Sequence, residues 1–156
     1  MRPTFVTCLV RELGHDHTVG GLLKKIFLRP FAAPSFAGFW RRWNPAYRYI
    51  LLFYFYAPLR RLLPRWMAKW FTFVLCGLLL HDLPFLHGWQ WLHGCRGFPE
   101  GALLFGIFGL GSWLSEAAPL DLSRCSAGLR VYANVACLIL CFAVYIGLCA
   151  LFSKSA

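Results

Sequence analysis

The sequence predicts an all-α integral membrane protein with about three transmembrane helices, preceded by interfacial or re-entrant helices. Of its 156 residues, 59% are hydrophobic and only 14% are charged, and the mean hydropathy is +0.57. A chain of this length forms one domain, whose surface-to-volume ratio is too high to hide that much apolar surface in a soluble core. Lipid is therefore the expected solvent for much of the chain.

The positive charge lies in the first half of the chain. Residues 1–69 hold twelve Lys and Arg against two acids, whereas residues 70–156 hold four of each. The cations are interleaved with aromatic and aliphatic residues, which predicts contact with anionic membrane lipids and a cytoplasmic position for this half, as in a bacterial plasma membrane. Nucleic-acid binding is not expected, because no helix-turn-helix, zinc-finger or RNA-binding motif is present.

Residues 1–34 form a basic amphipathic lead-in to a membrane domain at residues 35–156. Within residues 22–31, apolar side chains fall on one helical face and Lys24 and Lys25 on the other, as in a helix lying in the headgroup plane. Pro30 and Pro34 are expected to break this helix.

Ser35 is the expected N-cap of a helix that runs to about Asn44. Pro45 disfavours the α conformation at Asn44, which places Asn44 at a helix end or a kink. There its side-chain amide can point at a ligand or back at the chain.

Residues 47–56 are apolar and aromatic. A helix of about ten residues covers only about half a bilayer, so this stretch predicts an in-plane or re-entrant segment. Pro58 and Pro64 bracket residues 59–63, which are expected to form a basic hinge at the membrane interface.

The first expected spanning helix covers residues 65–83 and is ended by Pro84. Lys69 is the expected interface anchor, and His81 lies roughly 18 Å beyond it at 1.5 Å per residue, near the middle of the hydrocarbon core. Gly77, one turn before His81, leaves room for a neighbouring helix or a substrate chain.

Two further spans are expected, at residues 101–114 and 128–152. The first is rich in glycines that let helices approach closely, and the second has over twenty largely apolar residues. One face of the second span carries Cys137, Cys141, Tyr145 and Cys149.

Two groups of metal-binding residue types do not predict a metal site. His15 and His17 form a single pair, and the spacing of His87, His93 and Cys95 matches no closed zinc pattern. The first group is interpreted as a polar lead-in and the second as an interfacial aromatic loop. The seven cysteines, an odd number, likewise predict no disulfide framework.

Three motifs, in order, resemble the core of the membrane-bound O-acyltransferase (MBOAT) family. They are Phe39-Trp40-Arg41-Arg42-Trp43-Asn44, then Tyr56-Ala57-Pro58-Leu59, then an apolar helix that ends in His81-Asp82. Members of that family carry an FW-x-x-W-[HN] signature, a tyrosine-x-proline-leucine element and a histidine late in a following transmembrane helix. The resemblance covers residues 35–84, and residues 99–152 would add further helices. Family members are several hundred residues long, so a partner membrane subunit that completes the site is also implied.

The resemblance implies transfer of an acyl group from a thioester donor to a hydroxyl. His81 would be the general base that takes the proton from the acceptor hydroxyl, and burial would keep its imidazole neutral. Asn44 would orient a substrate or donate a hydrogen bond to the developing oxyanion.

Supporting roles follow from the same resemblance. Arg41 and Arg42 would contact the phosphates of coenzyme A or of an acyl carrier's phosphopantetheine arm. Trp40, Trp43 and Asp82 would position the substrate. Neither a tightly bound cofactor nor a metal ion is implied, since the acyl thioester is itself the donor.

Each of these residues also has a structural interpretation. Asn44 can merely close a helix, His81 can hydrogen-bond a carbonyl at a helix end, and Arg41 and Arg42 can anchor the chain in lipid. On this interpretation the protein is a non-catalytic membrane scaffold or interaction subunit with a degenerate MBOAT core. Whether Asn44 and His81 face one shared cavity distinguishes the two interpretations.

Overall fold

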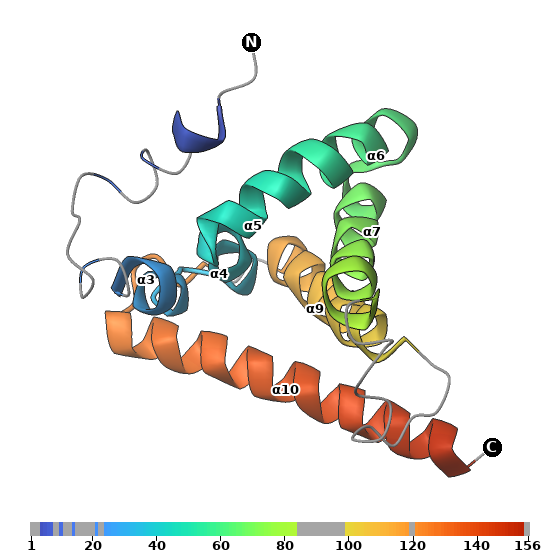
Figure 1. The fold of residues 1–156 in the computed structure, drawn as a ribbon. Helices are drawn as coiled ribbons and strands as arrows, with labels where there is room; N and C mark the ends of the chain where they lie inside the picture. The colour runs from blue at the N-terminus through green and yellow to red at the C-terminus, as the bar shows by residue number, and fades with distance from the viewer. Residues whose placement is uncertain are drawn as a thin grey trace.

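The structure is a computed structural model that describes residues 4–7, 10, 14, 21, 24–83, 99–118 and 121–154. Within these residues the chain is helical and contains no strand, as the sequence predicts (Figure 1). With η marking a π-helix, the helices are η1 (Lys24–Leu28), α3 (Arg29–Phe31), α4 (Phe36–Arg42), α5 (Pro45–Ile50), η2 (Leu51–Tyr56), α6 (Ala57–Leu62), α7 (Arg65–Gly77), η3 (Leu78–Asp82), α9 (Glu100–Ala117) and α10 (Ala127–Lys154).

The two groups of metal-binding residue types fall outside the described residues. These are His15 and His17 in the lead-in, and His87, His93 and Cys95, which lie between η3 and α9 in the sequence. Across the part of the chain that is described, no group of three or more His, Cys, Asp or Glu side chains is placed to hold a metal ion.

Helices α5, η2 and α6 join end to end into one rod (Figure 1). The backbone stays right-handed helical at the joins, with φ −58° and ψ −53° at Ile50 and φ −63° and ψ −47° at Tyr56. The prediction of a hinge between Pro58 and Pro64 is therefore wrong, because α6 (Ala57–Leu62) continues the helix through Pro58. A proline ring clashes with the carbonyl four residues before it in an α-helix, but Pro58 follows η2, where the pairing is i→i+5. The rod ends at Leu63, which is extended with ψ 152° as the residue before Pro64 should be.

Helix α4 begins where the sequence places it. The Gly38 N–H donates a hydrogen bond to the Ser35 Oγ at 3.0 Å, which confirms Ser35 as the N-cap. The aromatic rings of α4 pack inward, and Phe39 stacks on Trp43 with centroids 5.3 Å apart. These rings belong to a core of buried residues that joins α4, α9 and α10: Ala33, Phe36, Phe39, Phe108 and Cys141.

Glycines bring α7 and α9 into close contact. A Cβ at Gly77 would overlap the backbone carbonyl of Gly101, and a Cβ at Gly109 would lie 3.1 Å from Trp70. The Trp70 indole N–H donates a hydrogen bond to the Gly106 carbonyl at 3.0 Å. The room expected beside Gly77 is thus occupied by a neighbouring helix, and the predicted role of the α9 glycines is confirmed.

Asp82 caps α9 from another segment of the chain. Its Oδ1 accepts a hydrogen bond from the Gly101 N–H at 2.6 Å, and its Oδ2 accepts one from the Ala102 N–H at 2.9 Å. Pro99, at the N-cap position of α9, makes no side-chain cap. The Asp82 carboxylate therefore pairs two exposed N–H groups of α9 and meets the positive end of its dipole.

A buried asparagine fixes the first half of α10. The Asn134 side chain is 2% exposed, and its Nδ2 donates hydrogen bonds to the carbonyls of Phe31 at 2.8 Å and Ala33 at 2.9 Å. Because Phe31 ends α3 and Ala33 lies between α3 and α4, one amide group ties α10 to the connection between these two helices. This role of Asn134 was not predicted from the sequence.

The predicted face of α10 is the one that packs on the rest of the protein. Cys141 lies in the core, Cys137 packs against that core, and the Tyr145 hydroxyl is 3.2 Å from Glu100 Oε2, to which it donates a hydrogen bond.

Most of α10 is nevertheless exposed and apolar. Its segment Ala127–Leu151 is long and apolar enough to cross a membrane, with a mean hydropathy of 2.4 and only 11% of its most apolar stretch buried. Among the described residues, it alone of the three expected spans meets that length and hydropathy. The other two expected spans, at 65–83 and 101–114, lie in helices that carry charged residues, such as Lys69 and Glu116.

Candidate functional site

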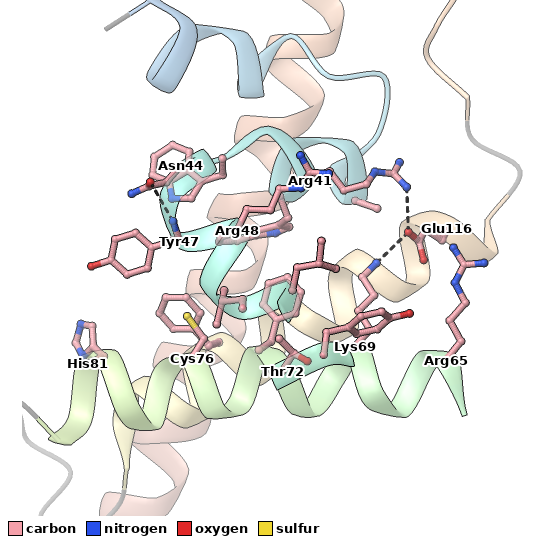
Figure 2. A pocket seen from close by; sticks show the side chains of 18 residues that line it. Arg41, Asn44, Tyr47, Arg48, Arg65, Lys69, Thr72, Cys76, His81 and Glu116 are labelled. Carbon is pink, nitrogen blue, oxygen red and sulfur yellow. Dashed lines mark hydrogen bonds and ion pairs between the residues drawn. The ribbon is translucent and has the colours of Figure 1, made fainter. Parts of the chain in front are cut away.

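A cavity of about 510 Å³ lies between two helical walls (Figure 2). One wall comes from α4, α5 and η2, and the other from α7 and η3, while α9 contributes Phe105 and Glu116. This volume falls within the roughly 300–1,000 Å³ that is usual for small-molecule sites.

Asn44 lines one end of this cavity in an unusual backbone conformation. Its φ of 37° and ψ of 88° are left-handed, and among the described residues no other non-glycine residue has a positive φ. Pro45 excludes the α region here, and asparagine tolerates the left-handed region better than most residues. The Asn44 Oδ1 accepts a hydrogen bond from the Tyr47 N–H at 3.4 Å, which caps α5. Its carboxamide oxygen is thus used by the chain, and its NH₂ group is the part that can serve a ligand.

The register of α7 and η3 decides which side chains line the opposite wall. Arg65, Lys69, Thr72 and Cys76 line the cavity at helical spacings of three and four, and the next lining residue is His81, five positions on. In an α-helix a residue five positions on points about 140° away. In a π-helix the hydrogen bonds run i→i+5, so that residue returns nearly to the same face. We infer that η3 turns His81 onto the cavity wall.

His81 lies at the same end of the cavity as Asn44 (Figure 2). The burial expected for its imidazole is wrong, because the side chain is 52% exposed in the last turn of the α7–η3 rod. Its Nδ1 is 4.0 Å from Asp82 Oδ1, the oxygen that also accepts from the Gly101 N–H.

The cavity brings together most of the residues predicted for the site. Those that line it are Trp40, Arg41, Trp43, Asn44 and His81. Arg42 does not line it, because the next residue on a helix points about 100° away from Arg41. Asp82 does not line it either, since its carboxylate caps α9 instead of positioning a substrate.

Trp40 adds a second hydrogen-bond donor to the lining residues. Its Nε1 is buried, and no acceptor for it lies within hydrogen-bond distance among the described residues. Buried polar groups in proteins are almost always paired, so a donor left in this state beside a cavity is a candidate ligand contact.

The basic end of the cavity was not predicted from the sequence. Arg48, Arg65 and Lys69 line it together with Arg41, and Glu116 joins them from the end of α9. Glu116 Oε1 lies 3.0 Å from Lys69 Nζ and 3.5 Å from Arg41 Nη1 (Figure 2). The i, i+4 spacing of Arg65 and Lys69, continued by Thr72 and Cys76, was the available sequence signal for this wall.

No protein-family model, curated protein or solved structure matches this chain. The site must therefore be interpreted from its own chemistry. It combines an imidazole and an amide donor at one end, an apolar middle and a cluster of cations at the other end. Such a lining suits an amphipathic ligand with a hydrocarbon or similarly extended chain.

Proposed function

We propose that the protein is a membrane-embedded acyltransferase of the MBOAT type, or a subunit of one, that moves an acyl group from a thioester donor to a hydroxyl. One observation carries the proposal: Asn44 and His81, separated by 37 positions in the sequence, line the same cavity. The tryptophans of the FW-x-x-W-N motif and Tyr56 of the tyrosine-x-proline-leucine element line it as well. All three motifs thus contribute to one site.

The chemistry assigns a role to each polar group. The His81 imidazole accepts the proton of the acceptor hydroxyl while the hydroxyl oxygen attacks the thioester carbonyl carbon. The Asn44 NH₂ group donates a hydrogen bond to the oxyanion that forms on the carbonyl oxygen. When the carbonyl re-forms, the C–S bond breaks, and the leaving thiolate takes from the imidazolium the proton that came from the hydroxyl. The products are an ester and a free thiol.

The exposure of His81 bears on its role as a base. An imidazole that is 52% exposed can be reached by an acceptor that enters from outside. The apolar side chains between the two ends, including Leu51 and Phe73, suit the acyl chain.

The membrane setting is part of the same proposal. The combined helix α7–η3 contains 18 residues, and so does α9. At 1.5 Å per residue each is roughly 27 Å long, which is close to the ~30 Å thickness of the hydrocarbon core. With α10 they would give three crossings, with the basic half of the chain on the cytoplasmic side of a bacterial plasma membrane. A partner membrane subunit would cover the exposed parts of the site.

The test is thioester-dependent acylation by the purified protein, with a partner subunit where one co-purifies. Release of free thiol and formation of ester are measured together for wild type and for His81→Ala, with His87→Ala as the matched histidine control. We expect His81→Ala to lose about 10²- to 10⁴-fold in rate, the usual contribution of a general base. His87→Ala should retain the wild-type rate.

A second candidate function is a non-catalytic membrane scaffold, which the wide exposed apolar surface of α10 favours. It predicts that His81→Ala acylates as well as wild type, or that neither protein shows activity with the partner present. Either result would reject the catalytic role of His81.

A further inference from the structure

The basic end of the cavity holds more positive charge than its carboxylate can balance. Among the described residues that line it, four are Lys or Arg and one is Glu, so the formal charge is 4 − 1 = +3 with His81 neutral. The cations come from α4, α5 and α7, which are separate elements that the fold brings to one place. Like charges held together in a partly desolvated site repel, and an anion relieves that repulsion.

Glu116 is the internal anion of this cluster. A single oxygen, Oε1, faces both Lys69 at 3.0 Å and Arg41 at 3.5 Å, and Figure 2 shows it between them, with Arg65 at the same end. The Lys69 side chain is only 22% exposed, so its ammonium group lies toward the cavity rather than in open solvent. A carboxylate that bridges two cations at the edge of a cavity occupies the position that the acidic group of a ligand would take.

The neighbouring part of the cavity is apolar. Leu51, Leu52, Phe73, Cys76 and Phe105 line it between the cations and the His81 end. Lys69 and His81 are 12 positions apart, which is roughly 18 Å along a helix at 1.5 Å per residue. One leaflet of a ~30 Å hydrocarbon core is about 15 Å deep, so the apolar section has nearly the length of one lipid chain.

We propose that this cavity binds a phosphate ester that carries one extended chain, and that its phosphate replaces Glu116 on Lys69 and Arg41. The guanidinium group of arginine matches the geometry of phosphate oxygens. A doubly charged phosphate also balances the several cations of this cluster better than a singly charged carboxylate does. The chain lies along the apolar section toward His81. This binding goes beyond acyl transfer, because it depends on the cations and not on the imidazole.

The experiment is a titration of the purified full-length protein in an uncharged detergent. Dodecyl phosphate is the probe and dodecanol its uncharged control, and binding is followed by tryptophan fluorescence, since Trp40 and Trp43 line the cavity. We expect the phosphate to bind at least tenfold more tightly than the alcohol. Lys69→Gln and Arg65→Gln should each weaken it about tenfold, as expected for loss of a charge-assisted hydrogen bond. Arg42→Gln, a neighbouring cation outside the cavity, should leave binding unchanged.

Glu116→Gln gives the test that a folding defect cannot imitate. Removing the competing carboxylate should tighten dodecyl phosphate binding several-fold, whereas damage to the site would weaken it. The proposal is overturned if Glu116→Gln weakens binding as Lys69→Gln does, if Arg42→Gln is equally harmful, or if alcohol and phosphate bind alike.

Parallel titrations with coenzyme A and with inorganic phosphate identify the source of the phosphate. Binding of coenzyme A as tight as that of dodecyl phosphate supports the site and assigns it to a thioester carrier. Binding of dodecyl phosphate alone supports the site and assigns it to a single-chain phospholipid. Binding of neither compound overturns the proposal. The titrations contain no thioester, so their outcome is independent of whether the protein transfers acyl groups.

Discussion

α7 and α10 both pack on α9 (Figure 1), but α7 packs closely against it whereas α10 leaves most of its apolar surface exposed. Against α7, the backbones meet at Gly77 and Gly101, and the polar groups at the contact are paired through Trp70 and Asp82. Against α10, contact is confined to one face, and only 11% of the most apolar stretch of Ala127–Leu151 is buried.

The difference distinguishes the α7–α9 pair, which shapes the site, from α10, which forms an exposed apolar surface. The α7–α9 pair positions His81, Lys69 and Glu116 around the cavity, so its close packing fixes the geometry on which any chemistry depends. α10 presents Tyr132, Leu140 and Ile146 outward, each more than half exposed. Exposed apolar surfaces of this kind are typical of contacts with lipid or with another protein.

The largest expected change in unfolding free energy comes from a Gly→Ala substitution, made once in α7 and once in α10. Gly77→Ala should lower the free energy of unfolding by about 3 kcal/mol, because the new Cβ overlaps the Gly101 backbone. Gly147→Ala, on α10, meets no atom within 4 Å and should raise it by up to about 1 kcal/mol through helix propensity. Denaturant unfolding in detergent measures both. Equal shifts of the same sign would contradict the contrast.

A middle-sized effect is expected where α10 is fixed to the core. Asn134→Ala should cost about 2 kcal/mol of unfolding free energy, because it leaves the carbonyls of Phe31 and Ala33 without their donor. Tyr132→Ala, two residues away and 72% exposed, is the control and should change it by less than about 0.5 kcal/mol. If the two variants unfold alike, the buried amide is not what holds α10 in place.

The smallest effect on folding is expected on the outer face of α10. Leu140→Ser and Ile146→Ser, at sites 65% and 63% exposed, should leave unfolding in detergent within about 0.5 kcal/mol of wild type. Combined in one chain, they should reduce the fraction of protein that stays with the bilayer after alkaline extraction, since each removes apolar surface from lipid. Undiminished retention would show that this face does not contact the membrane.

Local signals in the sequence predicted local structure. Ser35 caps α4, Asn44 leaves the α region before Pro45, and Leu63 is extended before Pro64, because each depends on neighbouring residues alone. The motifs also pointed to Asn44 and His81, which line one cavity.

Features that depend on tertiary contacts were missed. Asn134 donates hydrogen bonds to carbonyls more than a hundred positions away, and Arg48 and Lys69 line one cavity only because η2 packs on α7. The continuous rod through Pro58 depends on a π-helix, for which no spacing rule in the sequence gives a signal. The exposure of His81 likewise depends on which helices pack around it, not on the apolar residues around it in the chain.

The π-helix η3 couples the direction of His81 to the backbone pairing before it. A π turn holds one residue more than an α turn, so the five positions from Cys76 to His81 cover nearly the rotation that four positions cover in an α-helix. Deleting one leucine from residues 78–80 with a return to α pairing would leave the imidazole four positions after Cys76, still on the cavity wall. A return to α pairing at full length would instead turn the imidazole about 100° away from that wall, so the extra residue and the π turn have to occur together.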